Sequence, residues 1–274
     1  MKFFSPLIPA QCLKRYKRFF MDCTLLDSQK TPVTAHIANT GSLKEVFTQK
    51  EACPQKALLS YSKDPKRKLK YSLQMIKAKA TWVGVNTHLA NSLLWEQWEN
   101  YQKQKPIKMD FFYPYQWGQR EVKVSEGTRI DFVFHKNKER LLKLTKNLSK
   151  KILLEKIPWQ QQWLHEEKFH FIEVKNVSMA KNSIASFPDA KTTRGLKHIK
   201  ELLELQKQGH TVEMVFVVQR SDCHSFQPAK DIDPQYSQAL KAAYDQCLKV
   251  SAFPCLLNPN EICLNTTKPL KIIW

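Results

Sequence analysis

Two short stretches of the chain carry an acidic residue inside an otherwise apolar, strand-like run. The first is Arg129-Ile130-Asp131-Phe132 and the second is Ile172-Glu173-Val174-Lys175. Side chains alternate across a strand, so the glutamate and lysine of the second run share one face, about 7 Å apart. The isoleucine and valine of that run then point into a core. If the two strands are neighbours, Asp131, Glu173 and Lys175 converge.

These side chains suit the cleavage of a phosphodiester by metal-activated water. That reaction needs hard oxygen ligands for the metal, an oriented water and positive charge beside the phosphate. Asp131 and Glu173 fit as ligands of Mg²⁺ or Mn²⁺. Lys175 fits as the group that orients or activates the water and holds the phosphate. Glu121, ten residues before Asp131, could complete the metal shell or act as a base, with Lys123 on the same strand face.

The same residues also allow a purely structural interpretation. A glutamate and a lysine two positions apart can form a solvated pair worth less than about 1 kcal/mol. Charges next to buried strand residues are costly, however, unless they are paired or bound to a metal. The hydrophobic residues that flank Asp131 and Glu173 therefore favour a functional site.

The chain as a whole is strongly basic. It has 274 residues, of which 44 are lysine or arginine and 25 are acidic, giving a formal charge of +19. Nucleic acid is the usual partner of a soluble protein with this charge, and an acidic membrane surface is the alternative. No run reaches the roughly 18 apolar residues of a membrane span, and Met1–Ala10 is too short for a signal peptide. Seven scattered cysteines without a Cys-x-x-Cys pair indicate reduced thiols and a cytoplasmic location.

The first third of the chain predicts a small β-barrel, which we place at residues 1–85. Five short runs that alternate apolar and polar residues are separated by turn residues. The runs are Tyr16–Leu26, Pro32–Ile37, Ala57–Tyr61, Tyr71–Ile76 and Trp82–Val85. Basic residues of this region would contact a nucleic-acid backbone in a salt-dependent way; they are Arg15, Lys17, Arg18, Lys66, Arg67 and Lys68.

Residues 86–274 predict a second domain of mixed α/β type. A helix that Thr87 can cap comes first, with Leu93, Leu94 and Trp98 in its apolar stripe. Strands and helices then alternate, with a basic insertion at about 135–168. The predicted elements are strands Glu121–Val124, Arg129–Phe134, Phe169–Val174 and Thr211–Val218, a helix from about Thr193 to Gly209, and a helix over Gln235–Leu248.

The helix that begins near Thr193 carries three further polar candidates. Arg194, Lys197 and His198 could bind backbone phosphate near the site. Ordinary helix-surface charge is the alternative, and the helix pattern alone does not separate the two.

Taken in order, these blocks resemble the sugar fermentation stimulation protein family. The resemblance spans nearly the whole chain and rests on Arg15-Tyr16-Lys17-Arg18-Phe19, Asn39-Thr40-Gly41, Val85-Asn86-Thr87, Ala90-Asn91, Glu121-Val122-Lys123, the two acidic strand runs, Phe187-Pro188-Asp189-Ala190, Thr193-Arg194-Gly195, Lys197-His198, Phe226 and Pro228-Ala229. The chain departs from the family in one place: its connection between Phe134 and Phe169 is longer than the short link usual in the family.

The resemblance implies an N-terminal OB-like barrel and a C-terminal mixed-sheet α/β domain similar to the PD-(D/E)xK nucleases. The metal-binding acids of that pattern fall on Asp131 and Glu173, and its lysine falls on Lys175. The resemblance also implies DNA binding with little sequence preference and a regulatory link to sugar use, especially maltose.

The leading hypothesis is therefore a cytoplasmic DNA-binding protein with a Mg²⁺-dependent nuclease-type site. Two alternatives use the same residues. One is a DNA-binding regulator that keeps the nuclease fold without cutting, and the other is a ribonuclease.

Overall fold

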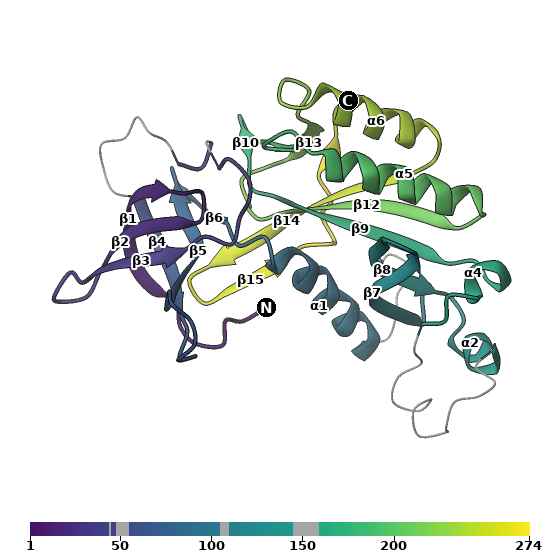
Figure 1. Ribbon diagram of the computed structural model, residues 1–274, viewed down its shortest axis with the longest axis horizontal. Helices are drawn as coiled ribbons and strands as arrows, with labels where there is room; N and C mark the ends of the chain where they lie inside the picture. Colours follow the sequence, from purple (N-terminus) through teal and green to yellow (C-terminus); the bar gives the residue numbers. More distant parts are fainter. Residues whose placement is uncertain (44, 48–54, 105–109, 145–158) are drawn as a thin grey trace.

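The first part of the chain folds into a small closed barrel (Figure 1). The computed structural model describes residues 1–43, 45–47, 55–104, 110–144 and 159–274. The first sheet has the order β3-β2-β1-β4-β5-β6, and an added pairing of β3 with β5 closes it. Its strands are β1 (Ile8–Tyr16), β2 (Phe20–Leu25), β3 (Pro32–His36), β4 (Gln55–Tyr61), β5 (Tyr71–Ala78) and β6 (Thr81–Gly84). Five strands form the barrel and β6 extends it as a hairpin, which confirms the predicted OB-like domain.

The start of the barrel differs from the prediction. The run Tyr16–Leu26 was expected to be one strand, but β1 begins at Ile8 and the chain turns at Lys17 and Arg18. A bulge near Cys12 interrupts the alternation of β1. The apolar pattern of this strand is therefore too irregular to be recognised in the sequence.

The second part of the chain is built on a mixed six-stranded sheet of order β15-β14-β12-β9-β8-β7. Strands β9, β12 and β14 are parallel to one another, and the outer pairings are antiparallel. The strands are β7 (Trp117–Ser125), β8 (Thr128–His135), β9 (His170–Val177), β12 (Thr211–Val218), β14 (Lys249–Asn258) and β15 (Glu261–Leu264). This arrangement confirms the predicted mixed α/β domain.

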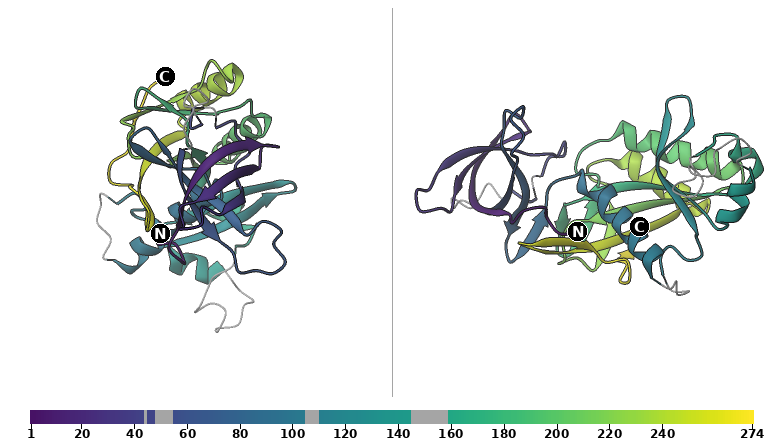
Figure 2. Two further views of the ribbon diagram at one scale, coloured as in Figure 1. Left: turned by 90° about the vertical axis from the view of Figure 1, so that its left-hand side faces the viewer. Right: turned by 90° about the horizontal axis from the view of Figure 1, so that it is seen from below.

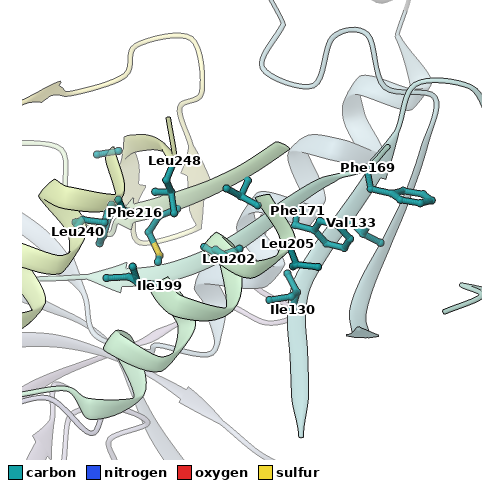
Figure 3. Close-up of a cluster of buried hydrophobic side chains, with 14 of the residues drawn as sticks. Ile130, Val133, Phe169, Phe171, Ile199, Leu202, Leu205, Phe216, Leu240 and Leu248 are labelled. Atoms are coloured by element: carbon teal, nitrogen blue, oxygen red, sulfur yellow. The ribbon is translucent and has the colours of Figure 1, made fainter. Parts of the chain in front are cut away.

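Helices cover both faces of this sheet. Helix α1 (Leu89–Lys103) lies on one face, and α5 (Thr193–Lys207) and α6 (Pro234–Asp245) lie on the other (Figures 1 and 2). Figure 3 shows the cluster under α5 and α6, where Ile199 and Leu202 meet Phe171 and Phe216. The apolar stripe predicted for α5 is thus its buried face. With both faces covered, the central strand β12 is apolar almost throughout.

Several short elements complete the domain. A small sheet has the order β10-β11-β13-β16, from β10 (Ala180–Lys181), β11 (Ile184–Phe187), β13 (Ser225–Pro228) and β16 (Lys271–Ile272). The basic insertion contains α2 (Lys138–Leu144) and α4 (Trp163–Glu166), and its residues 145–158 lie outside the described part. No described helix is long and apolar enough to cross a membrane.

The barrel and the larger domain are joined at the start of α1. Thr87 does not cap the helix as predicted, because His88 occupies the N-cap position. The Thr87 hydroxyl instead donates to the carbonyl of Ala38 in the barrel, at 2.8 Å. Barrel residues Leu58 and Met75 share a hydrophobic cluster with residues of α1. The prediction of a helix at this place is therefore right, but its first turn serves as a joint between the domains.

Candidate active site

The strands β8 and β9 lie side by side, as predicted, and separate next to Asp131. Their pairing runs from Phe134↔His170 to Phe132↔Ile172. Beyond it, Oδ2 of Asp131 accepts the backbone N–H of Val174 at 2.8 Å. The aspartate side chain therefore takes the place of a strand hydrogen bond where the sheet opens, and its carboxylate lies next to the Glu173-Val174-Lys175 run.

Glu173 is almost completely buried, and its two carboxylate oxygens differ. Its side chain is 3% exposed. Oε1 accepts a hydrogen bond from Nζ of Lys175 at 2.8 Å and contacts Nδ1 of His198. Oε2 is buried and has no hydrogen-bond partner among the described residues. A buried carboxylate oxygen without a partner is costly, so its retention calls for a ligand or another explanation.

The two carboxylates have opposite pKa shifts. Burial raises the pKa of Asp131 to about 6, and the negative charge of Glu173 adds to this effect. Burial also acts to raise the pKa of Glu173, but hydrogen bonds and charge from His198 and Lys175 outweigh it, so that pKa lies below its usual value. At neutral pH both groups are therefore mainly ionised and available as oxygen ligands.

One aspartate, Asp233, ties together the starts of helices α5 and α6. Asp233 accepts the backbone N–H of Thr192 at 2.8 Å and that of Tyr236 at 3.0 Å, at the start of each helix. Gly195 allows the two helices to approach closely, since a Cβ there would lie 2.8 Å from the Tyr236 ring. Burial, followed by the charge of Glu173, raises the pKa of the Tyr236 hydroxyl. The Tyr236 side chain thus forms part of the enclosed surroundings of Glu173.

The residues present fit a Mg²⁺ ion held by Asp131 and Glu173. No cluster of three or more His, Cys, Asp or Glu side chains suited to a metal occurs within the described part of the chain. Mg²⁺ sites commonly use only one or two carboxylates and leave the other positions to water and substrate phosphate. The free Oε2 of Glu173 is an acceptor that such a cation would satisfy.

Comparison with known proteins identifies the family. A model of the SfsA N-terminal OB domain matches residues 13–85, and one of the sugar fermentation stimulation protein RE domain matches residues 160–261. The chain is 42% identical to the sugar fermentation stimulation protein homolog of Bdellovibrio bacteriovorus, over 99% of this chain and 100% of that relative. The chain belongs to the sugar fermentation stimulation protein family.

Other members of the family support this assignment along the full length. The homolog of Pelagibacter ubique is 35% identical, and the alignment covers 100% of this chain and 99% of the relative. The solved structure of SfsA from Pyrococcus furiosus in complex with Ca²⁺ is similar, with a TM-score of 0.69, 20% identity, and coverage of 100% of this chain and 98% of that one. At this identity the archaeal structure shows a shared fold.

The third acidic residue proposed from the sequence, Glu121, lies apart from this cluster. Glu121 has a positive φ of 52° in β7, and its exposed carboxylate lies 3.8 Å from the guanidinium of Arg129. The described hydrogen bonds of Asp131 come from Asn91 and Val174 and not from this strand. A catalytic role for Glu121 remains a prediction, and the structure gives it no contact with the acidic pair.

The barrel residues proposed for DNA binding fall into two groups. The guanidinium of Arg15 donates to the carbonyls of Arg18, Ser42, Gly41 and Asn39, at 2.9, 2.6, 3.0 and 3.4 Å, so it holds the barrel loops together. Most of the others are exposed and lie in the β1–β2 turn or the β4–β5 connection; they are Lys17, Arg18, Lys66 and Lys68, with Arg67 partly buried and bonded to Ser72.

The three polar residues proposed on α5 are also used differently. Lys197 is exposed and lies 3.4 Å from Glu201. His198 is buried and contacts Glu173, while Arg194 donates to His198 at 3.2 Å. Arg194 and Lys197 are thus both exposed, but only Arg194 also reaches the site, through His198.

Two residues of the site were not identified as such from the sequence. Nδ2 of Asn91 donates to Oδ1 of Asp131 at 2.8 Å, and the charge of Glu173, after burial, helps to raise the pKa of Tyr236. Asn91 belongs to one of the blocks that carry the family resemblance. An asparagine in the first turn of a helix has no sequence pattern that marks it as a site residue. The approach of Tyr236 depends on the packing of α5 against α6, which no local signal reveals.

Proposed function

We propose that this protein binds DNA with little sequence preference and cleaves phosphodiester bonds in a Mg²⁺-dependent reaction. The observation that carries this proposal is the unpartnered, buried Oε2 of Glu173, next to Asp131 and with Lys175 on its other oxygen. In a purely structural ion pair, both oxygens of a buried carboxylate are usually bonded. An enclosed pair of carboxylates with an ammonium group at one side suits a cation and a phosphate together.

Each residue has a defined part in this reaction. The bound Mg²⁺ would supply charge neutralisation and a water of lowered pKa. Asp131 and Glu173 would hold the cation, and Asn91 and the Val174 N–H fix the orientation of the Asp131 carboxylate. Lys175 would hold the scissile phosphate or the attacking water through its remaining N–H groups. The Ca²⁺ complex of the archaeal relative supports a site for hard, oxygen-binding cations in this family.

The path that we propose for the nucleic acid runs from the barrel to this site. Phe19 in the β1–β2 turn stacks on His36 with ring centroids 6.4 Å apart. Burial, followed by the positive charge of Arg67, lowers the pKa of His36. His88 immediately precedes α1, whose Asn91 contacts Asp131. A strand that stacks on the exposed aromatic ring and follows these basic groups would reach the acidic pair.

The cleavage test uses labelled single- and double-stranded DNA and RNA with Mg²⁺ or Mn²⁺. Glu173→Gln and Lys175→Ala should each reduce cleavage at least 100-fold, while Glu204→Gln, an exposed position on α5, should leave it unchanged. If Glu173→Gln and Lys175→Ala both cleaved as fast as the wild type, the activity would belong to another site or to a contaminant. Cleavage confined to RNA would favour the ribonuclease, and salt-dependent binding without cleavage would favour the regulator.

The binding test separates electrostatic contacts from structural ones. Lys17→Ala combined with Arg18→Ala should weaken DNA binding and reduce the salt dependence of the affinity by about two counterions. Lys249→Ala, at an exposed position of β14, is the matched control. Arg15→Ala should mainly destabilise the barrel, because its donors are bound to carbonyls. An affinity that does not change with salt would contradict this picture.

The proposal includes a link to sugar use, which the family name supports. A strain that lacks the gene should differ from its parent in growth on maltose, and the intact gene should restore growth. The Glu173→Gln gene would then show whether that effect requires the acidic site.

A further inference from the structure

A histidine lies directly behind the acidic pair. His198 on α5 is 8% exposed, and its Nδ1 contacts Oε1 of Glu173 and lies 2.8 Å from Nζ of Lys175. On the other side of the ring, Nε of Arg194 donates to Nε2 at 3.2 Å. Both nitrogens of this ring therefore have partners, and neither is directed to solvent for a phosphate.

The partners determine which ring nitrogen carries the proton in a neutral imidazole. A guanidinium is only a donor, so Nε2 of His198 must accept from Arg194. The proton of the neutral ring then resides on Nδ1, a tautomer that follows from the hydrogen bonds. Nδ1–H can be donated only to Oε1 of Glu173, because the Lys175 ammonium is itself a donor.

We propose that His198 is a positioning residue of the site, which holds Oε1 of Glu173 so that Oε2 remains free for the cation. Arg194 is the residue that selects the required tautomer. This inference rests on the proposed function to the extent that the ligand of Oε2 is a divalent cation. It gives His198 a task inside the protein, in place of the contact with backbone phosphate expected from its position on the helix.

The arrangement also keeps Lys175 available. An ammonium group has three donors, and Oε1 of Glu173 is its only hydrogen-bond acceptor in the described structure once Nδ1 of His198 carries a proton. Two donors of Lys175 can therefore turn to a phosphate or a water. If His198 adopted the opposite tautomer, Nδ1 would accept from Lys175 and draw it away from the substrate.

The first test measures Mn²⁺ affinity in the full-length protein without nucleic acid. Residues that orient metal ligands typically contribute 10- to 100-fold to the affinity. His198→Ala should weaken Mn²⁺ binding by that factor. His198→Asn, whose side-chain N–H can replace Nδ1–H, should stay within about 3-fold of the wild type. Lys200→Ala, at an exposed position on the same helix, is the control and should bind normally.

The second test reads the tautomer in the metal-free protein, by NMR on protein labelled with ¹⁵N at histidine. The wild type should show the proton of His198 on Nδ1, and Arg194→Met should give a mixture of tautomers. Thermal unfolding verifies that each variant is folded. A proton on Nε2 in the wild type, unchanged Mn²⁺ affinity in His198→Ala, or an affinity of His198→Asn as weak as that of His198→Ala would overturn the role.

These outcomes separate the inference from the proposed function. If Mn²⁺ binding depends on Glu173 but not on His198, the metal site is supported and the positioning role of His198 is contradicted. If the wild-type protein binds no Mn²⁺, the proposed metal site is wrong, and so is the role of His198 in metal binding. The NMR result would still show whether Nδ1–H holds Glu173.

Discussion

We expect the charge of Asp131 to reduce the stability of the folded protein. Its pKa of about 6 lies above the usual value of 3.8, because burial and the charge of Glu173 disfavour the ionised form. A carboxyl group with a raised pKa binds protons more tightly in the folded state than in the unfolded state. Its destabilising effect is therefore complete above pH 6 and fades as the pH falls toward 4.

Replacement of this charge should stabilise the protein while removing its proposed activity. Asp131→Asn should raise the free energy of unfolding at pH 7 by about 1–3 kcal/mol, since a shift of two pKa units corresponds to roughly 3 kcal/mol. Asn91 can turn its amide to keep its hydrogen bond. Chemical denaturation at pH 7 and pH 4 would measure the effect, which should nearly vanish at pH 4.

The control for this comparison is Asp231→Asn, at an exposed position. It should change the stability by less than about 0.5 kcal/mol at either pH. An Asp131→Asn protein that is less stable than the wild type at pH 7 would show that the hydrogen bonds of the carboxylate matter more than its charge. Metal-dependent cleavage should be lost in either case.

At the level of single residues, much of the site could be predicted from the sequence. The convergence of Asp131, Glu173 and Lys175 follows from alternation along two strands and from their adjacency, which the structure confirms. The orientation of each side chain could not be predicted. The hydrogen bonds from Asn91 and His198 come from two different helices, and only the packing of those helices on opposite faces of the sheet brings them together.

Among the elements, α5 and α6 are joined at their first turns by one side chain, that of Asp233. Asp233 accepts backbone N–H groups from the first turn of α6 and from the N-cap of α5. Such caps each contribute about 0.5–2 kcal/mol, and a buried donor left without a partner adds to the loss. The start of α5 in turn places the helix that carries His198.

Removal of this shared cap should destabilise the protein and loosen the site. We expect Asp233→Ala to lower the free energy of unfolding by about 2–4 kcal/mol and to weaken Mn²⁺ binding. Asp233→Ser, which keeps one acceptor, should lose about half as much. Denaturant unfolding and Mn²⁺ titration would measure both effects, and Asp231→Ala is the exposed control. Equal stability of Asp233→Ala and the wild type would refute the shared-cap role.

The long elements of this chain are visible in the sequence and the short ones are not. The apolar stripe of α5 and the continuous apolar run of β12 are strong local signals, and both are confirmed. Strands β10 and β16 have two residues each, too few for any period to appear. The pairing that forms their sheet joins distant segments and is determined by tertiary contacts.

For the molecule as a whole, Gln219 is one of the residues that join the two domains. It is fully buried at the end of β12. Its Nε2 donates to the carbonyl of Asn86, at 2.8 Å, and to Oδ1 of Asn176, one position after Lys175. The backbone carbonyl of Gln219 accepts the N–H of Gly84 from the barrel at 2.8 Å. The side-chain amide of Gln219 therefore links the start of α1 to the strand that carries the site, and its backbone carbonyl adds the contact with the barrel.

Gln219→Met keeps the length of this side chain and removes its two side-chain hydrogen bonds, while the backbone contact with Gly84 remains. The acceptors of Asn86 and Asn176 would be left unsatisfied, so the free energy of unfolding should fall by about 1–3 kcal/mol. Gln238→Met, at an exposed position on α6, is the control and should be nearly neutral. Calorimetry would measure the change. A stability equal to that of the wild type would show that the joint does not depend on this amide.

The same joint limits how freely the two halves of such a protein can be exchanged. The family models treat the OB and RE segments separately, yet Leu58 and Met75 of the barrel pack in one cluster with α1. A chimaera that combines the barrel of one relative with the larger domain of another would place foreign side chains against both this cluster and Gln219. Evolutionary recombination at this boundary should therefore be rare unless both sides of the joint move together.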